Sequence, residues 1–399
     1  MTNSETKTGP LNGIRVLDLT RILAGPSCTQ LLGDYGADIV KVERPGLGDD
    51  TRAWGPPYVK DVDGYDTSES AYYLAANRNK RSIALDMATS EGAETIRQLA
   101  AKCDILVENF KTGGLNRYGL DYESLKEINP AIVYCSITGF GQTGPNAKLA
   151  GYDLMAQGYG GIMSLTGEPD GQPMKVGVGV ADIMCGMYAS TAILAALRHR
   201  DQTGEGQYID VALVDTQVAW LVNEGVNYLT SGKVPIRRGN QHPNIVPYQI
   251  FEVSDGYLII AVGNDNQFVK FCAAIGHPEL SKDPRYTVNI DRITNRENLL
   301  ETLIPIIKRI DKDTLLSAMN AAGVTCGPIN TLDEVFASDQ VAAREMKITM
   351  PHPQSGSGTV DLIGNPVKFS KTPVTYRNAP PLCGADTYEI LNDWLKDKQ

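Results

Sequence analysis

Long hydrophobic runs are missing from this sequence of 399 residues. None approaches the roughly 18 consecutive apolar residues that a transmembrane helix requires, so no membrane partner is expected. The first ten residues, MTNSETKTGP, also lack the basic, apolar and small-residue regions of a secretory signal. The sequence therefore predicts a cytoplasmic protein.

Paired cysteines are absent as well. The seven cysteines are odd in number, widely scattered, and never form a CxxC pair. This pattern argues against a disulfide framework and against a zinc site. We expect buried free thiols and no bound metal.

Positive charge is in deficit, with 37 Lys and Arg against 47 Asp and Glu and a formal net charge of −10. Binding a nucleic-acid backbone needs a net or strongly segregated positive field, so no nucleic-acid partner is expected. A few local cations can still hold the phosphates of an anionic ligand. Such cations lie in the first third of the chain, near predicted strand ends or in loops: Lys41, Arg44, Arg78, Lys80, Arg81, Lys111 and Arg117.

A dinucleotide-binding fingerprint is missing too, because RILAGP rather than GxGxxG follows the first predicted strand, IRVLDLT. The first 140 residues nevertheless alternate between short β-branched runs and helical patterns, which is typical of a parallel sheet with crossover helices. We predict an α/β fold with a Rossmann-like doubly wound parallel sheet, in which ligands bind at the carboxyl ends of the strands. The predicted strands cover residues 14–20, 37–43, 82–87, 104–110 and 131–138.

The pattern changes after about residue 230, which predicts a second domain. A long helix at 183–198, a strand at 208–213 and a helix at 215–229 precede it. We assign residues 1–200 to a large domain and 230–326 to a smaller α+β domain. Residues 201–229 and 327–369 are interpreted as linkers. The end of the chain, about 370–399, is expected to return and complete a discontinuous large domain.

Seven further motifs follow one another along nearly the whole chain: VLDLTRILAGPSCTQLLGDYGADIVKVERPGLGD, NRNKRSIALDM, DILVENFKTGGLNRYGLDY, ITGFGQTGP, AGYDLMAQ, TGEGQYIDVAL and VTCGPINTLDEV. In this order they resemble the class III CoA-transferases, the CaiB/BaiF or formyl-CoA transferase family. The resemblance implies a large Rossmann-like domain built from both ends of the chain, a smaller domain between, and two subunits interlocked as a homodimer.

Asp153, in AGYDLMAQ, matches the catalytic aspartate of that family. A carboxylate can attack a thioester to form a mixed anhydride, and the released CoA thiolate then converts it to an aspartyl-CoA thioester. From the residues alone, Asp153 would be a helix N-cap for the segment that follows it. The two roles are compatible, because a helix N-terminus stabilises negative charge.

An anhydride must be protected from water, which calls for a flexible cover. The segment RRGNQHPNIVPYQ stands where the family has a glycine-rich loop, although from the residues alone an interdomain turn is equally favoured. It reads Gly239, Asn240, Gln241 and His242 where the formyl and oxalate enzymes have only glycine. Arg237, Arg238 and His242 can instead bind the far carboxylate of a dicarboxylic acid.

Coenzyme A is expected as a substrate and not as a tightly bound cofactor. Its phosphates and adenine need cations, backbone amides and an apolar slot. Any single Arg or Lys among the candidates can also be an ordinary solvated loop charge. The candidates by matched position are Arg21, Ala24, Arg44, Asn109, Phe110, Arg117 and Tyr118, to which we add Lys80 and Arg81.

Two other functions stay open. An α-methylacyl-CoA racemase needs two proton carriers, but Tyr152 stands where its histidine would be, while Asp182 matches its second group. A non-catalytic CoA-binding protein would have no need of a nucleophile. Within the transferases, GNQHPNIVPYQIF most resembles enzymes that act on succinyl-CoA with glutarate or related C4–C5 dicarboxylates. Mesaconate, malate, itaconate and aromatic acids are alternatives for the acceptor.

Overall fold

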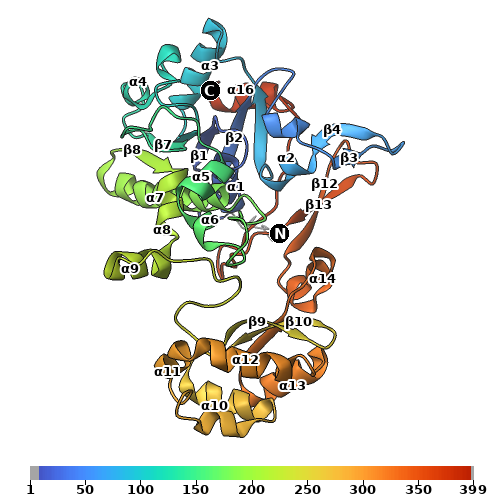
Figure 1. Cartoon of the computed structure of the whole chain (residues 1–399). Helices are drawn as coiled ribbons and strands as arrows, with labels where there is room; N and C mark the ends of the chain where they lie inside the picture. Colours follow the sequence, from blue (N-terminus) through green and yellow to red (C-terminus); the bar gives the residue numbers. More distant parts are fainter. Residues whose placement is uncertain (1–8, 397–399) are drawn as a thin grey trace. The chain divides into compact units, whose positions relative to one another are not determined.

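The computed structural model describes residues 9–396, and its centre is a parallel sheet of six strands in the order β5-β2-β1-β6-β7-β8 (Figure 1). Every neighbouring pair is parallel. Most of these strands are short apolar runs with few exposed residues, as expected when helices cover both faces of a sheet. The strands are β1 (Arg15–Asp18), β2 (Asp38–Glu43), β5 (Lys80–Ala84), β6 (Ile105–Glu108), β7 (Val133–Thr138) and β8 (Gln207–Ala212).

The strand order reverses between β1 and β6. The chain moves outward from β1 through β2 to β5, returns to β6 beside β1, and then moves the other way to β8. The loops that leave the carboxyl ends of β1 and β6 therefore diverge. They open a crevice there, which is the usual ligand site of this sheet type. The predicted doubly wound parallel sheet is confirmed.

Helices cover both faces of the sheet. On one face, α1 (Ala24–Asp34) and α7 (Val180–Thr203) share a buried core with alternate residues of the strands, including Val16 and Ile105. On the other face, α3 (Ser90–Ala100) and α16 (Thr387–Trp394) pack against Leu17 and Leu106. The alternation of Val16 and Leu17 between the two cores follows from the period of two along a strand.

Among the described residues 9–396, α7 is the one helix that is long and apolar enough to cross a membrane by length and composition. The sequence prediction did not identify a run of this kind. Over half of its most apolar window, 56%, is buried. Its buried residues pack against α1 and the sheet, as in the core helix of a soluble domain.

The chain forms two compact units. Unit 1 comprises residues up to Met163, Lys175–Lys233 and the segment from Asp339 onward. In its last segment, α16 packs on β5, and the Trp394 indole donates a hydrogen bond to Asp38 at 2.9 Å. The predicted domain limits at residues 1 and 399 lie outside the described residues.

Two segments predicted as linkers contain ordered parts of unit 1. β8 is an edge strand of the main sheet, although a polar stretch before it suggested a connection. In the second segment, β12 (Lys347–Pro351) and β13 (Thr359–Ile363) form an antiparallel pair that shares a small core with Tyr73 and Leu74. The other elements of unit 1 are η1 (Asp50–Ala53), β3 (Tyr58–Lys60), β4 (Asp66–Ser70), α2 (Ala71–Ala75), η2 (Asn116–Tyr118), α4 (Tyr122–Lys126), α5 (Asp153–Tyr159), α8 (Leu213–Ala219), α9 (Val222–Ser231) and α15 (Asp339–Ala343), and α6 (Ile162–Leu165) crosses the boundary.

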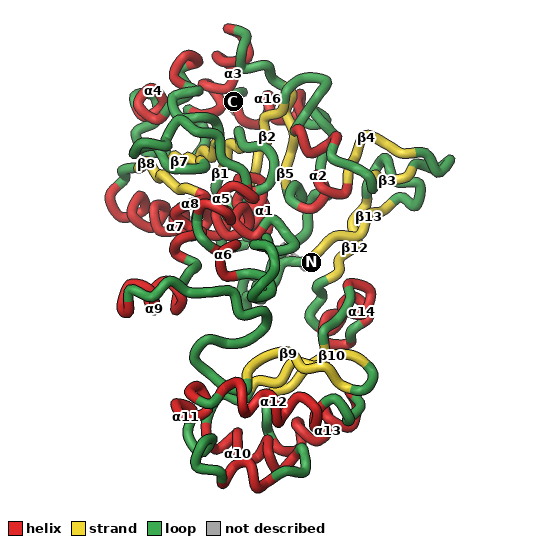
Figure 2. Tube along the Cα trace, in the orientation of Figure 1, coloured by secondary structure: helices red, strands yellow, loops and turns green. Residues whose placement is uncertain are grey.

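Unit 2 comprises Ser164–Met174 and Val234–Ser338, and Figure 2 shows its helices and short strands. It has its own hydrophobic core. An antiparallel sheet in the order β11-β10-β9 carries helices whose apolar faces include Phe268, Leu303 and Leu315. Its elements are β9 (Tyr248–Val253), β10 (Gly256–Ala261), α10 (Asp265–Ala274), η3 (Pro278–Lys282), α11 (Asn289–Thr294), α12 (Arg296–Ile307), α13 (Lys312–Ala322), β11 (Thr325–Pro328) and α14 (Leu332–Ala337).

Candidate active site

The carboxylate of Asp153 lies at the N-terminus of α7. Asp153 is the first residue of α5, but its Oδ1 accepts hydrogen bonds from the backbone N–H of Ala181 at 2.8 Å and of Asp182 at 3.3 Å. These are first-turn donors of α7, which have no partner within their own helix. Asp153 thus caps the neighbouring α7 and not the segment that follows it. The positive end of the α7 dipole stabilises the negative charge of this carboxylate.

Gln157 holds the second carboxylate oxygen. Its Nε2 donates a hydrogen bond to Asp153 Oδ2 at 2.7 Å, and its Oε1 accepts one from the Val176 N–H at 2.8 Å. The Val176 contact fixes the amide orientation, so the donor must face Asp153. Gln157 is fully buried whereas Asp153 is half-buried. The buried Gln157 therefore orients the Asp153 carboxylate, which remains partly accessible to solvent.

The backbone before Asp153 crosses another segment at a pair of glycines. An added Cβ on Gly151 would lie 2.2 Å from the Cα of Gly139, and one on Gly139 would lie 2.5 Å from the Cα of Gly151. Both obstacles are backbone, which cannot rotate away as a side chain can. This crossing fixes the approach of the chain to Asp153.

We expect Gly151→Ala to destabilise unit 1 by about 1 to 3 kcal/mol, because the overpacking cannot be relieved locally. The displaced backbone should also lower transfer activity. Gly177→Ala is the matched control, since its added Cβ meets nothing within 4 Å. Thermal unfolding and steady-state rates measure both effects, and equal midpoints for the two variants would contradict the prediction.

The nucleophile candidate adjoins the crevice at the strand reversal. A Cβ on Gly179 would lie 3.0 Å from Leu23 Cδ2 and 3.7 Å from Asp153 Cγ, so the loop after β1 and Asp153 flank the same glycine. In that loop Ile22 has a φ of 74°, a costly conformation for a β-branched residue. Its N–H donates to Asp49 Oδ1 at 3.2 Å. Strained residues of this kind cluster at ligand sites.

Asp182 is a second acidic group beside Asp153. Burial, followed by the negative charge of Asp153, raises the pKa of Asp182 to about 7. The same pair of carboxylates, after burial, raises the pKa of Tyr72. The folded protein thus holds the Asp182 carboxyl protonated at pH values where a free aspartate has lost its proton.

We expect Asp182→Asn to stabilise the protein increasingly as pH rises. The pKa of Asp182 lies above its unfolded value of 3.8, so the wild type loses folding free energy between about pH 4 and pH 7, while asparagine does not titrate. The stability difference between variant and wild type should grow by about 2 kcal/mol from pH 5 to pH 8. Thermal midpoints across this range measure it, and a difference that is independent of pH would refute it.

Three of the predicted CoA contacts come together at the carboxyl ends of β1 and β6. The Arg21 backbone N–H donates to Asn109 Oδ1 at 3.0 Å, and Asn109 Nδ2 donates back to the Arg21 carbonyl at 2.7 Å. The Arg21 guanidinium lies 5.9 Å from the Phe110 ring centroid and pairs with Asp50. Ala24 is buried at the start of α1. The loops after β1 and β6 are thus tied into one surface.

Two exposed arginines flank this surface in sequence. Arg44 follows β2 directly, and its guanidinium makes no hydrogen bond or ion pair with the described part of the chain. The Arg117 guanidinium lies 4.5 Å from the ring centroid of Tyr118, in η2. Both cations are accessible to a phosphate, unlike the buried basic residues of the sheet.

Lys80 and Arg81 were predicted as CoA contacts, but in the structure both form ion pairs with carboxylates of the same chain. Lys80 is fully buried, and its Nζ donates to Asp18 at 3.1 Å and to two further oxygens. The Arg81 guanidinium pairs with Asp38 at 2.5 Å and with two acidic residues of α16, Glu389 and Asp393. They stabilise the sheet and its C-terminal helix. The carboxylate partners of both residues are distant in sequence.

The predicted cover loop belongs to unit 2. The guanidinium of Arg237 donates to the backbone carbonyls of Glu168, Pro169 and Gly171, at 3.1, 3.4 and 2.6 Å. Gly239 has a φ of 57°, a left-handed conformation that favours glycine. Asn240 is exposed, the Gln241 N–H donates to the Arg238 carbonyl, and the His242 ring lies 5.1 Å from that of Tyr248.

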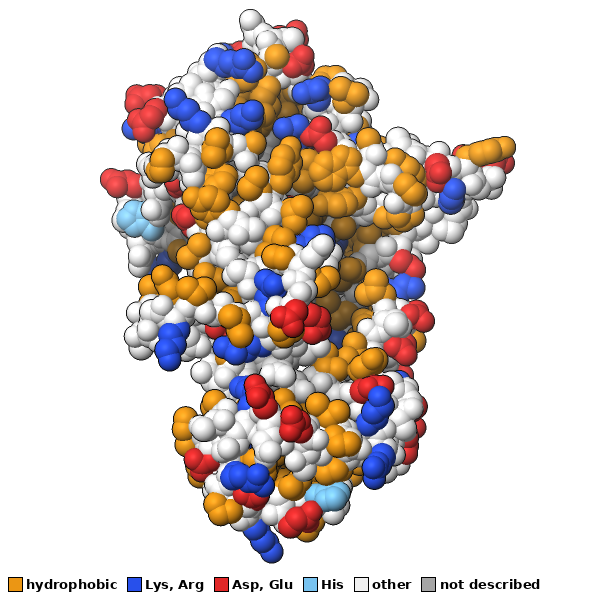
Figure 3. Space-filling model, viewed as in Figure 1, with side chains coloured by type: hydrophobic (Ala, Val, Ile, Leu, Met, Phe, Trp, Pro, Cys, Tyr) orange, Lys and Arg blue, Asp and Glu red, His pale blue; other side chains and the backbone are white. Residues whose placement is uncertain are grey.

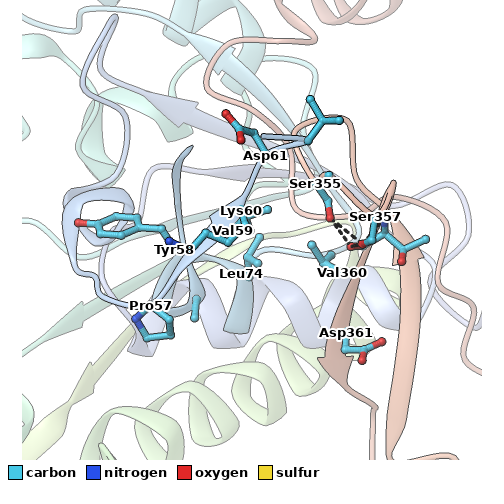
Figure 4. A pocket seen from close by; sticks show the side chains of 14 residues that line it. Pro57, Tyr58, Val59, Lys60, Asp61, Leu74, Ser355, Ser357, Val360 and Asp361 are labelled. Atoms are coloured by element: carbon cyan, nitrogen blue, oxygen red, sulfur yellow. Dashed lines mark hydrogen bonds between the residues drawn. The ribbon is translucent and has the colours of Figure 1, made fainter. Parts of the chain in front are cut away.

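A cavity of about 460 Å³ lies elsewhere in unit 1, between β3 and the β12–β13 pair (Figure 4). Its lining has no histidine or cysteine. The Ser355 and Ser357 hydroxyls both donate to the Thr359 carbonyl, and Lys60 pairs with Asp66. The residues that line this cavity offer no activated nucleophile for covalent chemistry.

Large apolar side chains surround Asp153 on the surface. Figure 3 shows hydrophobic side chains gathered on the face of unit 1 that carries α5. Apolar surface on this scale is characteristic of an interface. The exposed residues of α5 and α7 and the residue before α5 include Tyr152, Leu154, Met155, Tyr159, Met187 and Tyr188.

Comparisons with known proteins identify the family of this chain. The family model described as CoA-transferase family III matches residues 11–387. A protein of Agrobacterium fabrum named succinate–glutarate CoA-transferase is 49% identical over 392 residues, 98% of this chain and 97% of that protein. The human succinyl-CoA:glutarate CoA-transferase is 43% identical and covers 97% of this chain and 86% of its own.

A solved structure is similar over the same extent. The crystal structure of a CaiB/BaiF family protein from Brucella suis has a TM-score of 0.84 and 50% sequence identity, covering 97% of this chain and 100% of that chain. The match therefore includes unit 1, unit 2 and the returning C-terminal segment. The chain belongs to CoA-transferase family III, the CaiB/BaiF family.

Proposed function

We propose that this CoA-transferase moves CoA from succinyl-CoA to glutarate or a related C4–C5 dicarboxylate, with Asp153 as the nucleophile. The observation that carries the proposal is the oriented, half-buried carboxylate of Asp153 at the N-terminus of α7. The substrate pair is supported by the names of the relatives from Agrobacterium fabrum and human.

In the first half of the reaction, an Asp153 carboxylate oxygen attacks the thioester carbonyl carbon of succinyl-CoA. The carbon–sulfur bond breaks, the CoA thiolate leaves, and a mixed anhydride remains. The thiolate then attacks the Asp153 carbonyl carbon and displaces succinate, which gives an aspartyl-CoA thioester. Two acyl-transfer steps on Asp153 thus replace one direct exchange of CoA between succinyl-CoA and the free acid, which react poorly with each other.

In the second half, a glutarate carboxylate attacks the aspartyl thioester and displaces the CoA thiolate. The thiolate attacks the glutaryl carbonyl of the new anhydride, which forms glutaryl-CoA and restores the Asp153 carboxylate. The hydrogen bonds from α7 and Gln157 hold this carboxylate in position, which favours attack at one angle. The anhydrides require exclusion of water.

We assign CoA itself to the crevice at the strand reversal. Arg21, Asn109 and Phe110 form its floor, and Arg44 and Arg117 supply cations for the phosphates. Ala24 lies at the start of α1, and Tyr118 adjoins Arg117. Gly179 has both Leu23, in the loop after β1, and Asp153 beside it, which supports thioester delivery to the nucleophile from this crevice.

We further propose a cytoplasmic homodimer of interlocked subunits. The exposed apolar side chains of α5 and α7 support burial by a second copy of the chain. Sedimentation equilibrium of the purified protein tests the dimer. A monomer at micromolar concentration would contradict it.

The substrate proposal is tested with a panel of free acids offered with succinyl-CoA, read as new thioesters by mass spectrometry. We expect glutaryl-CoA and equimolar succinate, with a preference over oxalate, mesaconate and benzoate. Succinyl-CoA hydrolysis without any new thioester would refute a transferase acting on these acids. Exchange of an α-proton for deuterium in a branched acyl-CoA would instead favour the racemase reaction.

A further inference from the structure

The turn that follows β1 is held in place by side chains. Five consecutive polar groups of its backbone, from the Thr20 N–H to the Ile22 N–H, each form a hydrogen bond with a side chain, at 2.7 to 3.2 Å. Backbone groups at a surface can bond to water instead, so this number of protein partners exceeds what hydrogen-bond satisfaction requires. The partners, in chain order, are Asp18, Lys41, Asp49 and Asn109.

Two of these partners, Lys41 and Asp49, form an ion pair beneath the turn. Their charged atoms are 2.9 Å apart, and neither side chain has exposed surface. Lys41 Nζ also donates to the Thr20 carbonyl at 2.8 Å, and Asp49 Oδ1 accepts from the Ile22 N–H at 3.2 Å. The pair therefore bonds to the turn on both sides of Arg21. Burial acts to raise the pKa of Asp49, but the charge of Lys41 outweighs it and lowers this pKa to about 2, so the carboxylate stays charged.

A buried ion pair is a weak contribution to stability, because the cost of removing two charges from water can exceed the attraction between them. Its best attested use is to specify one arrangement of the chain. Here the arrangement is unfavourable by itself, since Ile22 has a φ of 74°. An apolar pair of the same volume could not bond to the Thr20 carbonyl or the Ile22 N–H. The ion pair thus fixes a conformation that the turn would not adopt alone.

This turn lies between the crevice and the nucleophile. On one side, the Arg21 guanidinium is 5.9 Å from the ring centroid of Phe110, in the crevice that we assign to CoA. On the other side, Leu23 packs beside Gly179, the residue before α7. The first N–H groups of α7 bond to the Asp153 carboxylate. A displacement of the turn would therefore change the position of bound CoA relative to Asp153.

We propose that Lys41 and Asp49 are positioning residues for CoA transfer, an inference that rests on the proposed function. Neither side chain reaches solvent, so neither contacts CoA or the reacting atoms. They act through the 20–22 turn, which they hold in the conformation that aligns the crevice with the Asp153 carboxylate. Without the pair, the turn gains freedom that CoA binding must remove.

The test removes both charges together, in the double variant Lys41→Met with Asp49→Asn, so that no buried charge remains unpaired. We expect the dissociation constant for CoA, measured by calorimetric titration, to rise about 10-fold, because the loosened turn is ordered on binding. The rate of CoA adduct formation on Asp153 after mixing with succinyl-CoA should fall about 100-fold, as for a misplaced reacting group. Intact-protein mass spectrometry of quenched samples measures this rate.

The matched control removes an ion pair at the opposite, amino ends of β1 and β6. Arg200 donates to Asp104 at 2.7 Å, and Asp104 accepts from the Arg15 N–H at the start of β1. Arg200→Met with Asp104→Asn should lower the thermal midpoint. Its dissociation constant for CoA should stay within about twofold of wild type, as for independent, distant sites. This control separates positioning from a general loss of stability.

CoA affinity and adduct formation within about twofold of wild type in the Lys41→Met, Asp49→Asn variant would overturn the inference. Equal losses in the control would also overturn it, since stability alone would then explain them. If the double variant does not fold, Lys41→Met alone is the test, because Asp49 keeps hydrogen bonds from Ile22 and Thr51. Unchanged CoA affinity in that variant would overturn the inference as well. If wild type binds CoA but transfers it to no acid, the proposed function fails, and the dissociation constants still test the ion pair.

Discussion

Asp153→Asn should reduce CoA transfer by roughly 10³-fold or more, because the amide that replaces the carboxylate is not a nucleophile. The stability cost should be small, near the ~1 kcal/mol of a lost helix cap. Part of the hydrogen bonding survives, since the Asn oxygen can still accept from Ala181. This separation of activity from stability distinguishes catalysis from capping.

The covalent intermediate gives a direct measurement. Intact-protein mass spectrometry after incubation with succinyl-CoA should show a CoA adduct on wild type, removed by hydroxylamine, and none on Asp153→Asn. Asp121→Asn is the matched control, because Asp121 caps α4 through the Ser124 N–H and has no part in the proposed reaction. An Asp153→Asn protein with full turnover would disprove the mechanism.

The second large effect is expected for Gln157→Met, a change that retains the volume of the side chain and removes its donor. Without the 2.7 Å hydrogen bond, the Asp153 carboxylate can rotate about its Cβ–Cγ bond. A misplaced reacting group costs about 10²-fold in rate. We expect the loss in kcat with KM nearly unchanged, which marks Gln157 as a positioning residue.

The pH dependence of the activity of Gln157→Glu is a measurement that a purely structural role of Gln157 would not affect. A glutamate carboxylate would repel Asp153, whereas its protonated form can donate the hydrogen bond as glutamine does. The activity of this variant relative to wild type should therefore rise as pH falls. A ratio that does not depend on pH, or a KM change equal to the kcat change, would argue against positioning.

Local patterns were sufficient to predict the main sheet. Short β-branched runs are buried on both faces, and β2 and β7 lie within the predicted strands 37–43 and 131–138. β3 was missed because it is short and follows two prolines, and β4 was missed because its sequence, DTSES, is polar; both features are unfavourable in strands. Their pairing depends on contacts with the distant β12–β13 segment.

The site was predicted in part. Asp153 came from the family resemblance, because its hydrogen-bond donors on α7 are 28 and 29 residues away. Gln157 was visible as the residue four positions later on the same helical face, but the sequence does not show that Val176 fixes its amide. Lys80 was added to the CoA contacts because it is basic and close to a strand end, but the sequence does not show that its side chain is buried and pairs with Asp18, 62 residues earlier on β1.

The return of α16 to β5 sets the order in which the protein can be completed during synthesis. Ser82 and its partner Asp386 are 304 residues apart, so a ribosome adding about 5 to 20 residues per second needs roughly 15 to 60 s between them. For that interval the apolar side of β5 has no helix to cover it. Nascent chains are thus exposed to aggregation at this edge long before the nucleophile is in place, and chaperone binding there should end only when the last helix emerges.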